Sequence, residues 1–183
     1  MACLCKGTPC QLAATGLGAA AAAERDGREK EAFKVDERRR FLDLLRTRGP
    51  ASLLEVGAGT GHDSLYFQGQ GLRVLCTDLS PAMAGLCRAK GLDAQVADFP
   101  GLGVPPASSD VGLFYAGTWG GVNKEGPVRD DRHPGARFFA FRSDRRMREA
   151  PAEYFRVLSF TTVDADRNHF QSFVLEKPRT VLP

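Results

Sequence analysis

The sequence predicts an α/β fold with a mostly parallel sheet and an antiparallel pair of strands at its edge. Between residues 53 and 98, short apolar segments alternate with amphipathic ones, and a glycine-rich loop follows the first apolar segment. Such alternation is typical of parallel strands connected by covering helices. Near the carboxyl terminus, "EYFRVLSFTTVD" and "NHFQSFVLEK" are joined by "ADR", which favours an antiparallel pair.

The length and composition fit one globular domain with an appendage. The chain has 183 residues, of which 26% are charged and 43% are apolar, and its net charge is +3. Its apolar runs are shorter than the roughly 18 residues that a membrane span needs, so we expect no membrane partner. We interpret the arginines between residues 129 and 148 as a solvated helix face, which disfavours a nucleic-acid partner.

The cysteines favour a reducing, intracellular setting, with the cytoplasm as the expected compartment and the nucleus or mitochondrion as alternatives. There are five cysteines, and neither a CxxC pair nor a histidine at metal-ligand spacing accompanies them. We therefore expect no metal site. Cys76 and Cys87 fall inside predicted elements and are expected to be buried thiols.

The chain divides into three predicted parts. Residues 1–30 contain an alanine run without a patterned apolar face, and we expect a disordered appendage there. Residues 31–178 form the predicted α/β domain, and residues 179–183 form a tail.

Local signals place the elements of the domain in order. An amphipathic helix spans residues 31–49 and stops at Gly49–Pro50. Another helix spans residues 62–70 and ends at Gly71. Ser80 is the expected N-cap of a third, which Gly91 stops. A short fourth helix starts after Ser143. The predicted strands are residues 53–56, 73–77, 94–98, 111–118, 155–163 and 169–176.

The glycine loop "EVGAGTGHD" carries the first functional signal. Glycines between a strand and a helix let the backbone turn tightly and approach a ligand, and the helix N-terminus offers unpaired N–H groups. A dinucleotide site requires G-x-G-x-x-G. Counting from Gly57 the last position is His62, and counting from Gly59 it is Ser64. The sequence therefore disfavours a nicotinamide dinucleotide.

The pattern E-x-G-x-G-x-G resembles the cofactor loop of class I S-adenosylmethionine-dependent methyltransferases. "DLSPAM" at the end of the second strand and "ADF" after the third resemble two further motifs of this family, in the same order. The "D-L-S-x-x-M" form is common among its small-molecule members. The resemblance covers about residues 52–178 and implies a Rossmann-like fold and S-adenosylmethionine as cofactor.

The resemblance also implies roles for single residues. The loop glycines would line the methionine and ribose portions, Glu55 would hold the loop and the cofactor's amino group, and Asp78 would accept hydrogen bonds from the ribose. Leu79 and Met83 would pack near the adenine, although Met83 also fits a core role. The implied cofactor-binding residues are Glu55, Gly57, Gly59, Gly61, Asp78, Leu79, Met83, Asp98 and Phe99.

The segment "PPASSDVGLFYAGTWGG" interrupts the resemblance. The family's sheet has seven strands, the last two forming an antiparallel edge pair, whereas six are predicted here. "VGLFYA" resembles the fifth strand of the family and alternatively fits the fourth. In either case one strand and its helices are absent, as a skipped coding segment would leave them. We expect marginal stability and a damaged acceptor pocket.

The function predicted from the sequence is a methyltransferase domain with a small-molecule acceptor. The internal shortening predicts impaired activity. Trp119 is a candidate acceptor contact at a strand end, with a core role as the alternative. His133 falls in a predicted lid-like loop, and His62 and His169 are expected to be structural. The competing hypotheses are a non-catalytic remnant that binds cofactor or partners weakly, and an RNA or protein methyltransferase that uses the arginine cluster. No catalytic residue is predicted.

Overall fold

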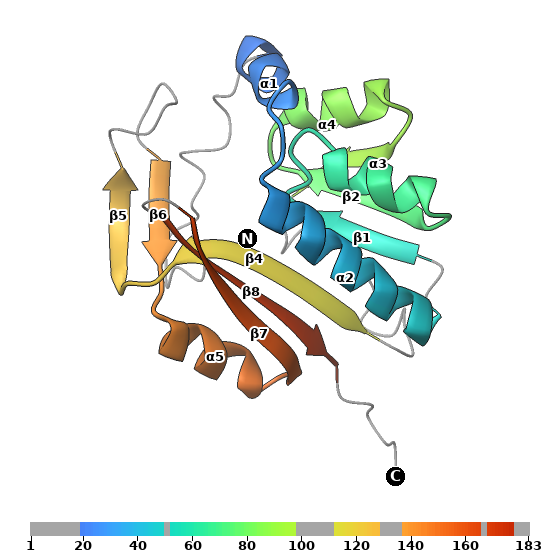
Figure 1. The fold of residues 1–183 in the computed structure, drawn as a ribbon. Helices are drawn as coiled ribbons and strands as arrows, with labels where there is room; N and C mark the ends of the chain where they lie inside the picture. The colour runs from blue at the N-terminus through green and yellow to red at the C-terminus, as the bar shows by residue number, and fades with distance from the viewer. Residues whose placement is uncertain (1–18, 50–51, 98–111, 129–136, 166–167, 178–183) are drawn as a thin grey trace. The chain divides into compact units, whose positions relative to one another are not determined.

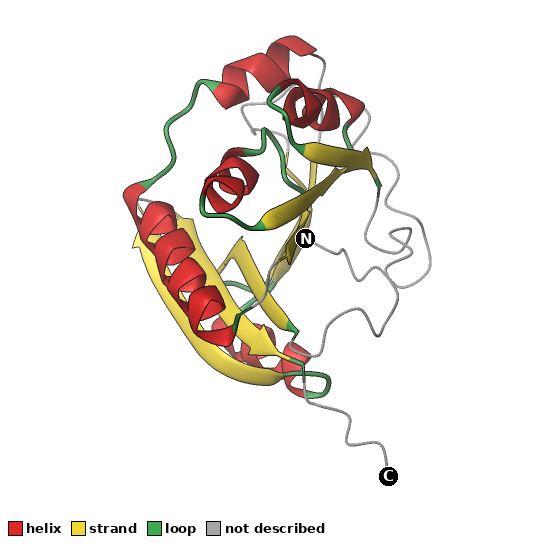
Figure 2. Ribbon diagram, turned by 90° about the vertical axis from the view of Figure 1, so that its right-hand side faces the viewer, coloured by secondary structure: helices red, strands yellow, loops and turns green. Residues whose placement is uncertain are grey.

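A computed structural model of the chain describes residues 19–49, 52–97, 112–128, 137–165 and 168–177 (Figure 1). The chain groups into two compact units, Met1–Val104 and Pro105–Pro183. Helices and strands alternate in the first unit, whereas strands predominate in the second (Figure 2). The expected domain limits at residues 31 and 178 stay predictions.

The first unit is built on a parallel sheet with the strand order β1-β2-β3. Its strands are β1 (Ser52–Val56), β2 (Arg73–Asp78) and β3 (Asp93–Val96). Helix α3 (His62–Gly69) connects the first two and α4 (Pro81–Ala89) the last two. In the register, Glu55 lies opposite Cys76, and Asp78 lies opposite Val96. The carboxyl ends of the strands therefore share one edge of the sheet, where the glycine loop begins.

The predicted helix boundaries of this unit are confirmed by their stop signals. Helix α2 (Ala32–Arg48) ends at Gly49, whose φ of 76° is left-handed, and the Gly49 N–H donates to the Leu45 carbonyl. At the start of α4, the Ser80 hydroxyl accepts a hydrogen bond from the Met83 N–H at 3.4 Å. Phe41, Leu42 and Leu45 on α2 are buried, as an amphipathic helix requires.

The expectation of disorder throughout residues 1–30 is wrong for its last third. Residues 1–18 lie outside the described residues, but Ala19–Asp26 form helix α1. Alanine has the highest helix propensity of any residue, and an alanine run forms the first part of α1. Ala22 is fully buried, so tertiary packing also stabilises a helix that would be marginal in isolation.

The second unit is an antiparallel sheet with the order β4-β8-β7. Its strands are β4 (Leu113–Gly120), β7 (Arg156–Ala165) and β8 (Asn168–Glu176). The predicted terminal strand pair is confirmed, with a register irregularity between Val157 and Ser159. Helix α5 (Asp144–Ala152) begins after Ser143, as predicted, and packs against β7.

A second hairpin in this unit was missed by the sequence analysis. Strands β5 (Lys124–Val128) and β6 (Arg137–Phe141) pair antiparallel in a sheet of their own. Gly126 and Pro127 made β5 resemble a loop, but proline is tolerated where its missing N–H faces no partner strand. The Phe139 and Phe141 rings, two residues apart on β6, stack with centroids 5.5 Å apart. The described residues thus contain eight strands rather than six.

The pairing of β4 favours the fifth-strand interpretation of "VGLFYA". Its whole length pairs antiparallel with β8, from Leu113 opposite Glu176 to Gly120 opposite His169. A fourth strand would belong to the parallel series, whereas β4 carries the antiparallel pair. Within the described sheets, β1 is bonded to β2 and β4 to β8, so each is an edge strand.

Burial agrees with this edge position. No residue of β1 or β4 belongs to the buried class, although "SLLEV" and "LFYAG" read as core strands. Phe114 keeps 41% of its surface exposed.

Among the described residues, no helix is long and apolar enough to cross a membrane.

Candidate functional site

Three loop glycines carry the backbone from β1 into α3. Gly57, Gly59 and Gly61 have φ values of 76°, 58° and 78°, in the left-handed region that favours glycine. A Cβ at Gly57 or Gly59 would meet no atom within 4 Å, whereas a Cβ at Gly61 would lie 2.7 Å from Leu92 Cδ1. The first two glycines therefore border open space, and the third serves close packing.

The Asp78 carboxylate lies against this loop. Its Oδ2 accepts a hydrogen bond from the Gly59 N–H at 2.8 Å, and its Oδ1 accepts one from the Ser80 N–H at 2.8 Å. Asp78 is only partly buried, and each carboxylate oxygen can accept a further hydrogen bond. The aspartate thus orders the loop and still offers acceptor positions to a bound molecule.

Two apolar side chains flank Asp78 at the carboxyl ends of β2 and β3. Leu79 and Val96 each keep 49% of their surface exposed. Val96 lies opposite Asp78 in the register and was missed by sequence reasoning. Its place as the last apolar residue of the third strand was the available signal. Exposed aliphatic groups beside a hydrogen-bond acceptor fit a ligand with both a flat apolar part and hydroxyl groups.

Glu55 lies beneath the loop in a chain of polar contacts. The Ser64 hydroxyl hydrogen bonds to its Oε2, and the Cys76 thiol donates to the Ser64 Oγ at 2.9 Å. Burial raises the pKa of Glu55 to about 7, against the opposing effect of the Ser64 hydrogen bond, and the Asp63 charge raises it further. The contacts tie β1 to α3, which fits the loop-holding part of its predicted role.

Residues 54–118 match a family described as the methyltransferase domain. The match begins in β1, includes the glycine loop and Asp78, and ends in β4. This part of the chain is therefore similar to a methyltransferase domain. No curated protein matches the sequence.

Solved structures share the fold at low identity. The 1,6-didemethyltoxoflavin-N1-methyltransferase of Burkholderia thailandensis has a TM-score of 0.56 and 19% identity over 74% of this chain and 75% of its own. The magnesium protoporphyrin IX methyltransferase of Synechocystis PCC 6803 has a TM-score of 0.60 and 13% identity, over 86% and 93%. The cyclase SpnF has a TM-score of 0.55 and 15% identity, over 76% and 80%. The chain therefore shares the Rossmann-like fold of these proteins.

The other predicted site residues do not lie at the glycine loop or are not described. Met83 is only 2% exposed and belongs to the core under α4, which fits the alternative role weighed for it. Asp98, Phe99 and His133 lie outside the described residues. Trp119 lies in the second unit, where its ring packs edge-on against Phe170 at 5.1 Å.

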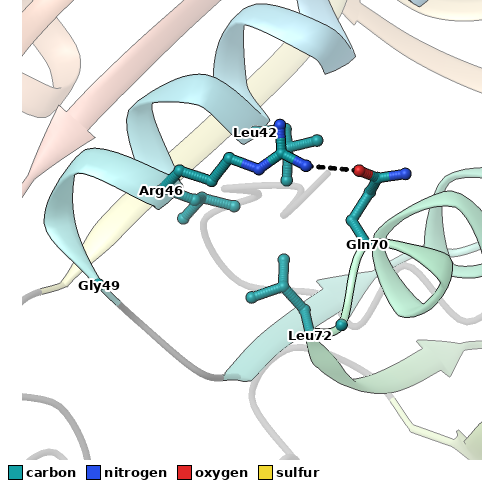
Figure 3. Close-up of a pocket in the computed structure, with 7 residues that line it drawn as sticks. Leu42, Arg46, Gly49, Gln70 and Leu72 are labelled. Carbon is teal, nitrogen blue, oxygen red and sulfur yellow. Dashed lines mark hydrogen bonds between the residues drawn. The ribbon is translucent and has the colours of Figure 1, made fainter.

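The cavity in Figure 3 is separate from the glycine loop. It measures about 270 Å³ and lies between the end of α2 and the turn from α3 to β2, at the amino end of β2. The Arg46 guanidinium and the Gln70 amide oxygen are 2.6 Å apart across its rim. The volume is below the range of about 300–1,000 Å³ typical of ligand pockets. The residues that line this cavity do not include any of the candidate cofactor-binding residues.

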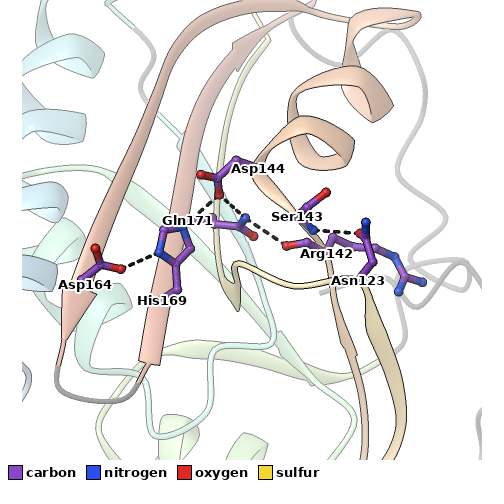
Figure 4. A network of polar contacts seen from close by, with 7 residues as sticks. All are labelled: Asn123, Arg142, Ser143, Asp144, Asp164, His169 and Gln171. Carbon is purple, nitrogen blue, oxygen red and sulfur yellow. Dashed lines mark hydrogen bonds and ion pairs between the residues drawn. The ribbon is translucent and has the colours of Figure 1, made fainter.

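A polar network in the second unit joins α5 to β7 and β8 (Figure 4). The His169 ring lies 2.6 Å from Asp164 Oδ1 and 2.9 Å from Asp144 Oδ1. The Gln171 amide donates to Asp144 at 2.5 Å and to the Arg142 carbonyl at 3.0 Å. Because both His169 nitrogens contact carboxylates, the network fits the structural role expected for this histidine. Among the described residues, no three side chains gather as a metal site would require.

Proposed function

We propose that the chain is an S-adenosylmethionine-dependent methyltransferase domain whose acceptor is a small molecule. The glycine loop carries the proposal: Gly57 and Gly59 face open space, and the Gly59 N–H is fixed by the ribose-binding candidate Asp78. Solved structures of the same fold were determined with S-adenosylhomocysteine, including the toxoflavin and protoporphyrin methyltransferases. When bound, the cofactor supplies an electrophilic methyl group.

Different residues of the chain would bind different parts of the cofactor. Gly57 and Gly59 would leave room for the cofactor's methionine and ribose, Asp78 would accept from the ribose hydroxyls, and Leu79 and Val96 would cover the adenine. Their exposure and register support these roles. Asp98 and Phe99 remain candidates from the resemblance, and Trp119 remains a candidate acceptor contact.

A matched pair of glycine substitutions tests the cofactor site. Gly59 and Gly91 both have positive φ, at 58° and 80°, and a Cβ on either would meet no atom within 4 Å. Gly59→Ala and Gly91→Ala therefore carry comparable backbone strain, about 1 kcal/mol each, but only the first places a methyl group in the proposed cofactor space. Calorimetric titration with S-adenosylhomocysteine should show at least tenfold weaker binding for Gly59→Ala and wild-type binding for Gly91→Ala.

The control separates a binding defect from a folding defect. Equal losses of affinity in both variants would attribute the effect to strain and remove the argument from the loop. Absence of binding by the folded wild-type chain would overturn the proposed function. A cooperative thermal transition by circular dichroism establishes that each variant is folded.

A non-catalytic domain is the second candidate function, supported by the edge positions of β1 and β4 in the described sheets. β1 and β4 are edge strands of the described sheets with no buried residue, as the loss of a fourth strand with its helices would leave them. That segment would also contribute to the acceptor pocket. The fold alone does not distinguish the candidates, since the similar structure SpnF is described as a cyclase. Cofactor binding without methyl transfer to any of a panel of small-molecule acceptors would favour this candidate.

A further inference from the structure

An ionic cluster joins the N-terminal helix to the glycine loop within the first unit. The Asp26 carboxylate, at the end of α1, pairs with the Lys90 ammonium and lies 2.9 Å from His62 Nε2. His62 immediately follows Gly61, and Lys90 is the C-cap of α4. The cluster therefore holds together three segments that are distant in sequence.

Lys90 connects this cluster to the loop backbone. Its Nζ also donates to the Thr60 carbonyl oxygen at 2.8 Å, and Thr60 is only 7% exposed. The same ammonium thus holds the Asp26 carboxylate on one side and a loop carbonyl on the other. Next to Thr60, Gly61 lies so close to Cys87 and Leu92 that a side chain would not fit. The carboxyl end of the loop is consequently fixed by both charge and packing.

Helix α1 is positioned to support this contact. Ala22 is fully buried and α1 packs against α4, beside which it is drawn in Figure 1. The Lys90 hydrogen bond lowers the pKa of Asp26, with further lowering by His62, so the carboxylate carries its charge at neutral pH. The Glu24–Arg28 pair, by contrast, is an exposed i,i+4 pair on the same helical segment.

We propose that α1 is a latch on the cofactor loop, in which Asp26 and Lys90 are positioning residues. The latch holds Thr60 and Gly61 in the conformation that binds the cofactor, so that less conformational freedom is lost on binding. This inference rests on the proposed function. In this proposal, α1 supports the cofactor site. Cofactor affinity should depend on salt, because salt screens partly exposed ion pairs.

The test compares Asp26→Asn with Glu24→Gln in the full chain. Each substitution removes one carboxylate charge from the same helical segment, but only Asp26 reaches Lys90 and His62. With S-adenosylhomocysteine as the titrant, Asp26→Asn should bind roughly two- to fivefold more weakly at low salt, the range expected for a partly exposed ion pair. The difference from wild type should shrink as salt is added, and Glu24→Gln should bind as wild type does.

Hydrogen exchange of the free chain provides a measurement that does not depend on the cofactor. The amides of residues 57–62 should exchange faster in Asp26→Asn than in Glu24→Gln or wild type. Lys90→Met should reproduce the effect, and combining it with Asp26→Asn should add little. Unchanged loop exchange in Asp26→Asn would overturn the latch. Failure of the wild-type chain to bind S-adenosylhomocysteine would instead overturn the proposed function, and the exchange result would still decide the latch.

Discussion

At the scale of single residues, the loop glycines and Glu55 have distinct structural roles. Gly57 and Gly59 supply positive φ beside open space, while Gly61 supplies positive φ under tight packing. Glu55 accepts a hydrogen bond from the Ser64 hydroxyl on α3. Burial raises the pKa of its carboxyl group to about 7, so this group titrates near neutral pH.

We expect Glu55 to make the free energy of unfolding fall as pH rises from its ordinary value of 4.5 to about 7. In this window the unfolded chain releases the proton that the folded chain retains, so deprotonation favours unfolding. The whole decrease is at most about 3 kcal/mol. Glu55→Gln should reduce this dependence of the free energy of unfolding on pH. Below pH 4.5, the ordinary pKa of the group, the pH dependence of the variant should differ little from that of wild type. Urea denaturation across this range measures the slope, and an unchanged slope in the variant would contradict the assignment.

At the scale of elements, the two serine N-caps provide a matched comparison. The Ser80 hydroxyl accepts from the Met83 N–H, whereas the Ser143 side chain makes no capping hydrogen bond to α5. Ser80→Ala should therefore lower the free energy of unfolding by about 1 kcal/mol, and Ser143→Ala by less than about 0.5 kcal/mol. Denaturant titration of both variants checks the difference. Equal losses would mean that the hydroxyl contact at Ser80 contributes nothing.

We also expect the attachment of α5 to weaken at alkaline pH. Hydrogen bonds to the Asp164 carboxylate and then to the Asp144 carboxylate raise the pKa of His169. A raised histidine pKa gives stability that is present below the unfolded value and is lost as pH rises through the folded value. His169→Gln should thus lower the melting temperature more at about pH 6 than at about pH 9. Arg145→Ala, on the exposed side of α5, should show no such pH dependence.

At the scale of the whole molecule, the candidate cofactor residues all belong to the first unit, whereas Trp119, the predicted acceptor contact, belongs to the second. We therefore expect S-adenosylhomocysteine to slow hydrogen exchange at residues 57–62 and 78–80, with no protection of α5 or β7. Equal protection throughout both units would contradict a site confined to the first.

Two exposed arginines of α5 contact other side chains of the second unit. The Arg148 guanidinium lies over the Phe160 ring, and Arg145 forms an ion pair with Glu149.

Much of the first unit was predictable because its signals are local. Ser80, Gly49 and the apolar pattern of α2 place helix ends and faces from neighbouring residues alone. The left-handed loop glycines followed from the same reasoning. For α1, alanine propensity is a local signal, but the helix also depends on packing against α4. For β5, the local signal misleads, because the Gly126–Pro127 pair resembles a turn.

The sequence by itself determined the parallel α/β unit, its glycine loop and the methyltransferase resemblance, because spacing along the chain sets these features. The tertiary structure decided which strand β4 joins, that Met83 is core while Val96 is exposed, and that Asp26 reaches Lys90 and His62. Contacts between residues far apart in sequence depend on how the elements pack. No local pattern of propensity or periodicity encodes such packing.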